Sequence, residues 1–111
     1  MDLLGRLTTL DDTPMLHLSG EIDIATLPTL RDHLTRAIQR HAGTVLFVDL
    51  DGLDALDDTG VGMLLGAAGQ ARSLGGDVVL VCTSERLLGR FAITGLDRAL
   101  TIVASATSGR R

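Results

Sequence analysis

Apolar and polar residues follow one another in blocks that predict a succession of strands and helices. Residues 4–10 are weakly strand-like, and residues 15–19 alternate apolar and polar positions, which is typical of a strand with one buried face. A turn is expected at residues 20–21. Apolar residues then recur at steps of three and four from 26 to 41, which predicts an amphipathic helix, with Pro28 in its first turn.

Strands and helices alternate in the rest of the chain. Two continuous apolar runs, 44–49 and 77–82, predict strands that are buried on both faces. Helices are predicted over 59–74 and 84–93, and a short strand over 99–103. The order β-β-α-β-α-β-α-β predicts an α/β domain in which helices pack on a mixed, mostly parallel β-sheet.

Composition limits the classes of function that remain. A chain of 111 residues predicts one domain, which we expect to span 1–104 with a mobile C-terminal tail over 105–111. Aromatic residues make up only 2%, so the core is expected to be aliphatic, and base stacking on single-stranded nucleic acid is disfavoured. The net charge of −4 and the absence of a basic run also argue against nucleic acid or an anionic membrane as a partner. The sequence has no signal-peptide pattern and no long apolar run, so a cytoplasmic location is expected.

The single cysteine and the histidines do not predict a metal or redox site. Cys82 lies in the apolar run VVLVC and is expected to be a buried structural thiol, with a redox role as the alternative. His17, His33 and His41 are scattered and lack metal-ligand spacing with Cys82, so structural roles are expected. The sequence therefore predicts no cofactor and no metal.

Residues 47–53, FVDLDGL, are very close to the opening motif of haloacid-dehalogenase-type phosphatases. In a small Mg²⁺-dependent phosphatase, Asp49 would be the nucleophile and Asp51 the acid and base. That class also needs a lysine, and this chain contains none; Leu53 stands where its threonine is expected. The simpler interpretation is a buried strand that ends in a polar Asp-Gly turn.

The triplet Asp58-Thr59-Gly60 matches the triplet of aspartic proteases, but a helical pattern follows it, whereas the protease triplet lies between strands. The triplet is better explained as a helix N-terminus, where Asp57 or Asp58 can cap the first N–H groups. Those N–H groups could also donate hydrogen bonds to a phosphate. The two adjacent aspartates would oppose it.

The helix that follows has two distinct sides. One side is predicted to face the core: Val61, Leu64, Ala68 and Ala71. Another side carries three glycines: Gly62, Gly66 and Gly69. Each glycine costs a helix interior roughly 1 kcal/mol relative to alanine. Two explanations fit them: close packing of another element of the same domain, or a smooth surface on which a partner docks.

Four segments in this order resemble STAS domains, in particular the small bacterial anti-sigma factor antagonists. They are LSGEIDIATLPTLRDHL (18–34), VLFVDLDGLDALDDTGVG (45–62), the Gly75-Gly76 break before VVLVC, and RFAITGLDRAL (90–100). The resemblance implies a regulator without catalytic activity that binds an anti-sigma factor, itself a serine/threonine kinase, and so releases a sigma factor. It further implies that phosphorylation at the start of this helix breaks the complex and that a phosphatase resets it.

This sequence departs from the family motif at the position that matters most. The motif reads Asp-Ser-Ser/Thr-Gly, with the first hydroxyl residue phosphorylated, and that position here is Asp58. Asp57 and Thr59 match its neighbours. Three outcomes remain open: a permanent phospho-like state that does not bind, constitutive binding, or phosphorylation of Thr59 instead. Thr59 points about 100° away from Asp58 around the helix.

The resemblance also implies a partner-binding surface. Its residues would be Asp23, Asp57, Asp58, Thr59, Gly60 and Gly62. Asp23 matches an acidic family position in the turn after the second strand, and it would lie near the start of the switch helix. Its structural role would be to cap the first helix or to fix that loop, and its functional role would be to contact the partner. A different function class remains possible for the same fold, namely a non-switching interaction or scaffold module of a sensory complex.

Overall fold

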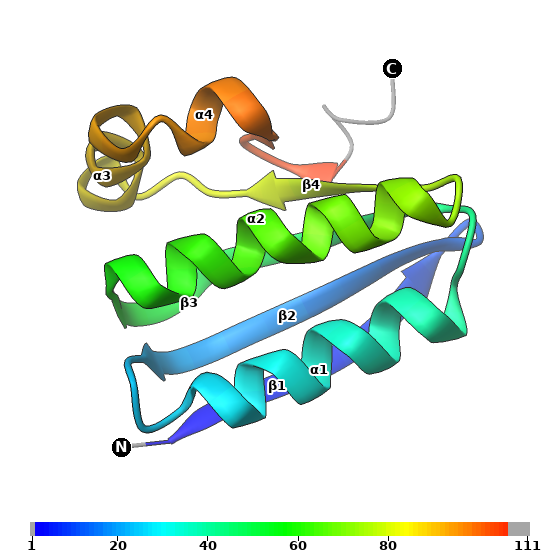
Figure 1. Cartoon of the computed structure of the whole chain (residues 1–111), viewed down its shortest axis with the longest axis horizontal. Helices are drawn as coiled ribbons and strands as arrows, with labels where there is room; N and C mark the ends of the chain where they lie inside the picture. Colours follow the sequence, from blue (N-terminus) through cyan, green and yellow to red (C-terminus); the bar gives the residue numbers. More distant parts are fainter. Residues whose placement is uncertain (1, 107–111) are drawn as a thin grey trace.

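A computed structural model describes residues 2–106 of the chain (Figure 1). The first half contains β1 (Leu3–Leu10), β2 (Thr13–Ile22), α1 (Leu27–Arg40) and β3 (Val45–Leu56). The second half contains α2 (Asp58–Ser73), β4 (Asp77–Val81), α3 (Glu85–Thr94), α4 (Leu96–Ala99) and β5 (Thr101–Val103).

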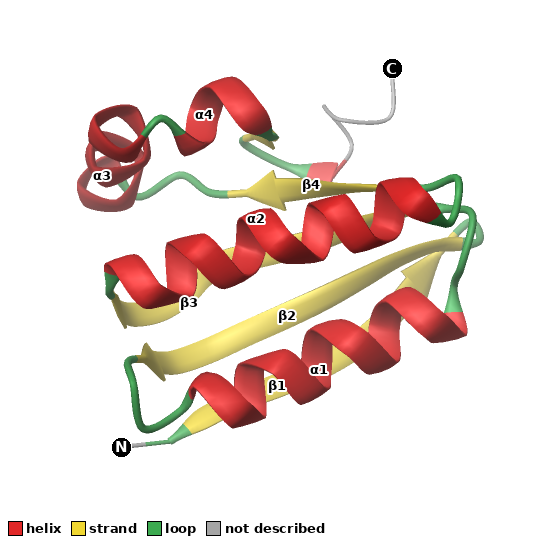
Figure 2. Ribbon diagram, in the orientation of Figure 1, coloured by secondary structure: helices red, strands yellow, loops and turns green. Residues whose placement is uncertain are grey.

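The five strands form one sheet in the order β1-β2-β3-β4-β5. β1 and β2 are an antiparallel hairpin, whereas β2, β3, β4 and β5 pair in parallel. α1 and α2 lie side by side across one face of the sheet, as Figure 2 shows. The expected fold class, an α/β domain with a mixed and mostly parallel sheet, is confirmed.

The main core lies between the helices and the sheet face that they cover, and it is mostly aliphatic, as composition predicted. Helix α1 contributes four residues at helical spacing: Leu30, Leu34, Ala37 and Ile38. Helix α2 buries the four residues predicted to face the core. Helix α3 contributes Leu87 and Phe91. A smaller cluster of Phe47, Val79 and Val81 lies apart from this core.

The predicted limits of β2 and β3 were wrong. The expected turn at Gly20-Glu21 lies inside β2, and β3 continues to Leu56 instead of ending near Asp49. The two extensions pair with each other through two register irregularities, so each gives the other its backbone partners. Gly20 has φ +107°, and a Cβ there would lie 2.1 Å from the Asp2 carbonyl oxygen, so the chain needs glycine at this bend rather than a turn.

The end of the chain differs from the prediction in one element. The final strand was expected over 99–103, but α4 occupies Leu96–Ala99 and β5 is only Thr101–Val103. Gly95, with φ +82°, ends α3 in the left-handed conformation and immediately begins α4. Of the expected tail, Ala106 packs against the smaller cluster, and 107–111 lie outside the described residues.

Cys82 is buried at the end of β4, as expected for a structural thiol. Burial raises the pKa of its thiol. A buried thiol that stays protonated is a poor nucleophile. Within residues 2–106, none of the helices is both long and apolar enough to cross a membrane.

Candidate functional site

The start of α2 is held by the side chain and backbone of Asp57. The carboxylate of Asp57 accepts hydrogen bonds from the Gly60 N–H, at 3.2 Å, and from the Thr59 hydroxyl. Its own N–H donates to the carbonyl of Ile22, at 3.1 Å. Asp57 is therefore the helix cap that the sequence allowed at either aspartate, and it ties the helix to the end of β2.

Asp58, the first residue of α2, points into solvent. Its side chain is 76% exposed, and its Oδ1 accepts a hydrogen bond from Arg90 Nη1 at 2.8 Å. Arg90 belongs to α3, and its side chain is 42% exposed. A carboxylate in the first turn also interacts favourably with the helix dipole. Asp58 is thus an accessible anion paired with a cation from another helix.

Polar contacts connect residues 83–90, which lead into and form most of α3, to the second half of β3 and the start of α2. The Asp51 carboxylate accepts from the N–H and hydroxyl of Thr83. One step further, Arg86 Nη2 donates to the Asp54 carbonyl at 2.8 Å. Arg90 then reaches Asp58, so all three contacts join residues 32 positions apart.

Neither arginine was predicted from the sequence as part of the site. The available signal was their spacing of four residues on the predicted helix, which places both side chains on one face. The sequence alone did not say which element that face would meet. The ends of two adjacent parallel strands, β3 and β4, bring α3 next to the start of α2.

The loop between β2 and α1 is the second part of the site. Asp23 Oδ1 accepts hydrogen bonds from the N–H groups of Ala25, at 2.9 Å, and Thr26, at 3.1 Å. Asp23 therefore fixes its own loop, one of its two expected roles. The loop lies beside the start of α2, because Ile22, just before Asp23, accepts the Asp57 N–H bond.

Gly60 and Gly62 have opposite surroundings. A Cβ at Gly60 would lie 2.4 Å from Ile22 Cγ2 and 2.6 Å from Leu56 Cδ1, so only glycine fits against the core. At Gly62, Gly66 and Gly69, a Cβ would meet nothing within 4 Å. Close packing of another element of the domain therefore does not explain these three glycines; the explanation as a smooth docking surface remains a prediction.

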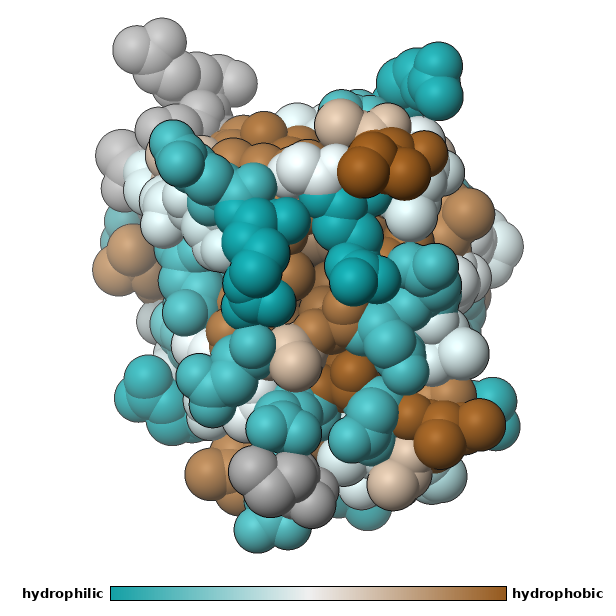
Figure 3. Space-filling model, turned by 90° about the vertical axis from the view of Figure 1, so that its left-hand side faces the viewer, coloured by the Kyte–Doolittle hydropathy of each residue, from teal (hydrophilic) through white to brown (hydrophobic). Residues whose placement is uncertain are grey.

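The residues at this end of the molecule come from three elements. Figure 3 looks onto the end that carries the start of α2, the loop before α1, and α3. Polar side chains cover most of this face, with apolar surface visible between them and beside them. Two large apolar side chains of these elements are strongly exposed: Ile24 of the loop, at 77%, and Ile93 of α3, at 88%.

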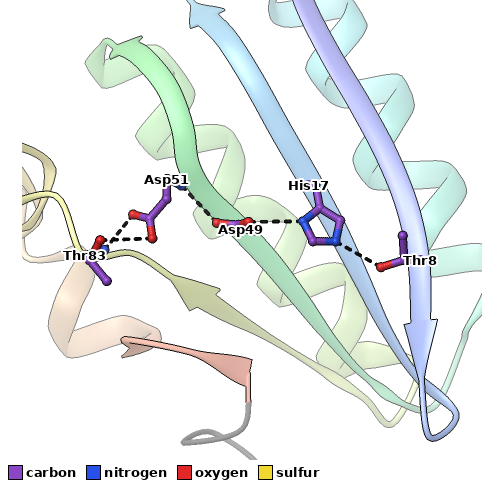
Figure 4. A network of polar contacts seen from close by, with 5 residues as sticks. All are labelled: Thr8, His17, Asp49, Asp51 and Thr83. Atoms are coloured by element: carbon purple, nitrogen blue, oxygen red, sulfur yellow. Dashed lines mark hydrogen bonds and ion pairs between the residues drawn. The ribbon is translucent and has the colours of Figure 1, made fainter.

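The aspartates of the phosphatase-like motif belong to a chain of polar contacts that runs from β1 through β2 and β3 to Thr83 (Figure 4). Asp49 accepts from His17 Nδ1 at 3.1 Å and from the Asp51 N–H at 3.0 Å, and the other nitrogen of His17 pairs with the Thr8 hydroxyl. Asp51 binds Thr83. The Asp49 carboxylate therefore joins β3 to β2, and the Asp51 carboxylate joins β3 to the segment that follows β4. Within residues 2–106, the histidines, cysteine and acidic residues do not form a group of three that could hold a metal ion.

The cap at Asp57 predicts a specific pH dependence. The Thr59 hydroxyl bond lowers the pKa of the Asp57 carboxyl most; desolvation opposes it, and smaller lowering effects come from the Gly60 and Thr59 N–H groups and the charge of Arg90. A lowered pKa contributes stability that is present above the unfolded value and is lost as pH falls through the folded value. We expect wild-type stability to fall below about pH 4 more steeply than that of Asp57→Asn, which can cap without titrating.

Urea unfolding across pH 2–7 measures this difference in the two proteins. Asp32→Asn is a suitable control, because Asp32 is exposed on α1 and its salt-bridge partner within residues 2–106 is Arg36, four residues later. Parallel acid profiles for wild type and Asp57→Asn would contradict the cap assignment.

Comparison with known proteins agrees with the fold. The family model described as STAS domain matches residues 6–108. An anti-sigma-B factor antagonist of Bacillus subtilis is 33% identical over 94 residues, which are 85% of this chain and 84% of the relative. One from Listeria monocytogenes is 36% identical over 87 residues, 78% of this chain and 75% of that protein. A crystal structure of an anti-sigma factor antagonist from Mycobacterium paratuberculosis superposes with a TM-score of 0.80 at 21% identity, covering 96% of this chain and 90% of the other.

The protein is thus an α/β domain in which helices pack on a five-stranded, mostly parallel sheet. It belongs to the STAS domain family, among the anti-sigma factor antagonists.

Proposed function

We propose that this protein is a cytoplasmic anti-sigma factor antagonist that binds an anti-sigma factor of the serine/threonine kinase type and so frees a sigma factor. The proposed binding surface consists of the Asp23 loop, residues 57–62 and the exposed side of α3. Catalysis by this chain is not part of the proposal, because Asp49 and Asp51 are engaged with His17 and Thr83.

The observation that carries this proposal is that the adjacent residues Asp57 and Asp58 have different environments. Asp57 is used inside the protein as the cap of α2. Asp58 faces solvent at the first position of the helix, with Ile24 and Ile93 exposed on neighbouring elements. An exposed charged centre flanked by apolar side chains suits a protein partner better than a small substrate.

We propose further that the complex is not released by phosphorylation. An aspartate at position 58 has no hydroxyl for a serine/threonine kinase to phosphorylate. At Thr59, the hydroxyl donates to Asp57 and lies next to Asp58 in the chain, so a phosphate there would meet two carboxylates. Such a protein would bind its anti-sigma factor constitutively.

The test is to mix the protein with each anti-sigma kinase of its source organism and ATP, then measure complex formation and intact mass together. We expect a stable complex with one kinase, displacement of its sigma factor, and no added phosphate. Asp58→Ser is the informative variant, because it recreates the family motif: it should gain one phosphate and leave the complex.

The other outcomes have defined meanings. A phosphate on wild-type Thr59 that dissolves the complex shows a switch shifted by one residue. Failure to bind any anti-sigma kinase rejects the antagonist function. Binding to a different sensory protein, without kinase or sigma factor, would instead support the non-switching scaffold module, which the missing serine at position 58 favours.

A further inference from the structure

We propose that Arg90 is a specificity-determining residue, which neutralises Asp58 so that an anti-sigma factor accepts a carboxylate at the start of α2. This inference rests on the proposed function and adds a residue to it. It answers the question raised by Asp58: an aspartate there resembles a partly phosphorylated state, yet the paired guanidinium removes most of the net charge that a partner would meet.

The geometry of the pair is that of a direct charge-assisted hydrogen bond. Arg90 Nη1 lies 2.8 Å from Asp58 Oδ1, within the range expected for an arginine–carboxylate contact. Both side chains remain accessible, so a docking partner would meet the pair as a unit. A carboxylate carries one negative charge, whereas a phosphate carries −1.5 to −2 at neutral pH, so one arginine can balance the first but not the second.

The backbone of α3 places Arg90 for this contact. Phe91, the residue after Arg90, is completely buried, and Leu87, three residues before Arg90, is buried as well. One turn before Arg90, Arg86 holds the carbonyl of Asp54 at 2.8 Å, so the helix is attached to the segment that leads into α2. The backbone that carries Arg90 is therefore held by a packed helix rather than by a loop.

The local charges explain why a cation is needed there. Asp57 and Asp58 are consecutive carboxylates, and the charge of Arg90 also helps to lower the pKa of Asp57. Without Arg90, two negative charges would face a partner across the start of α2. An exposed ion pair of this kind adds little to folding stability, so the contact acts through the charge that it presents. Like charges at an interface reduce association strongly.

The experiment measures affinity for the anti-sigma kinase that the wild-type protein binds, at low and high salt. Arg90→Gln should weaken binding at least tenfold at low salt, and less at high salt, because screening reduces the repulsion. Arg90→Lys should retain most of the affinity, since it keeps the charge. Arg36→Gln is the matched control: Arg36 pairs with Asp32 at 3.2 Å on the exposed side of α1, so the variant loses the same charge elsewhere and should bind within about twofold of wild type.

The double variant Asp58→Asn/Arg90→Gln completes a double-mutant cycle on binding affinity. The double variant should bind as well as Asp58→Asn alone, because Arg90 has no carboxylate left to balance. If Arg90→Gln weakens binding as much in the Asp58→Asn protein as in the wild type, the inference is overturned, because Arg90 would then contact the partner itself. Equal binding by wild type and Arg90→Gln would overturn it too, with the proposed function intact. If the wild type binds no anti-sigma kinase, the proposed function fails and this inference fails with it. Thermal unfolding of each variant confirms that it is folded.

Discussion

Replacing Gly60 by alanine will lower the free energy of unfolding by about 1–3 kcal/mol, the usual effect of forcing a methyl group into a packed interior. The new Cβ would lie 2.4 Å from Ile22 Cγ2 and 2.6 Å from Leu56 Cδ1. Both neighbours are core residues. The Ile22 side chain is branched at Cβ, so its Cγ2 methyl group moves only with a change of rotamer. The start of α2 must therefore shift away from β2 and β3. Urea unfolding measures the loss.

Gly62→Ala is the matched control, two residues further along the same helix. Its Cβ would meet nothing within 4 Å, and alanine is the better helix former, so stability should rise by up to about 1 kcal/mol. Equal effects of the two substitutions would contradict the packing of α2 against Ile22. The pair also separates two environments: Gly60 packs against core residues, whereas Gly62 faces open space on the proposed binding surface.

The sequence predicted the helices well because their burial follows a simple period. In α1, the apolar steps of three and four predicted residues 26–41, and the helix is Leu27–Arg40. Such a pattern survives in one sequence because each buried position repeats the same geometry. The buried strands β3 and β4 were found for a similar reason, since central parallel strands are apolar on both faces.

The sequence failed where backbone pairing overrides local composition. The stretch 50–56 alternates polar and apolar residues imperfectly and contains an Asp-Gly pair, which favours a turn. The extended end of β2 pairs with it and keeps it in the sheet. The local sequence of 50–56 does not indicate that β2 pairs with it, so a strand held by long-range hydrogen bonds was interpreted as a loop.

The candidate site was predictable only in part. The aspartates and the glycines at 57–62 follow one another in the chain, and a helix start is visible from that stretch alone. Arg90 is 32 positions from Asp58, and only the pairing of β4 beside β3 brings α3 next to α2. Contacts between elements depend on topology, so the cation that faces Asp58 could not be identified from spacing.

Replacing Phe91 by alanine will cost about 3–5 kcal/mol of unfolding free energy, the largest loss that we expect from a single substitution. Phe91 is 0% exposed and lies in the main core, whose other buried residues are mostly aliphatic, so its removal leaves a cavity that small neighbours cannot fill. Domains of this size are stable by only about 5–15 kcal/mol. Urea unfolding of both proteins at one temperature measures the difference.

Ile93→Ala provides the control within the same helix. Ile93 is 88% exposed, so its truncation should change stability by no more than about 0.5 kcal/mol, although it should weaken partner binding if the exposed side of α3 belongs to the interface. A loss below about 1 kcal/mol for Phe91→Ala would contradict the packing of α3 on the sheet. If the loss is as large as expected, Phe91 is also what holds Arg90 opposite Asp58. The variant should then bind an anti-sigma factor less tightly even under conditions in which it is fully folded.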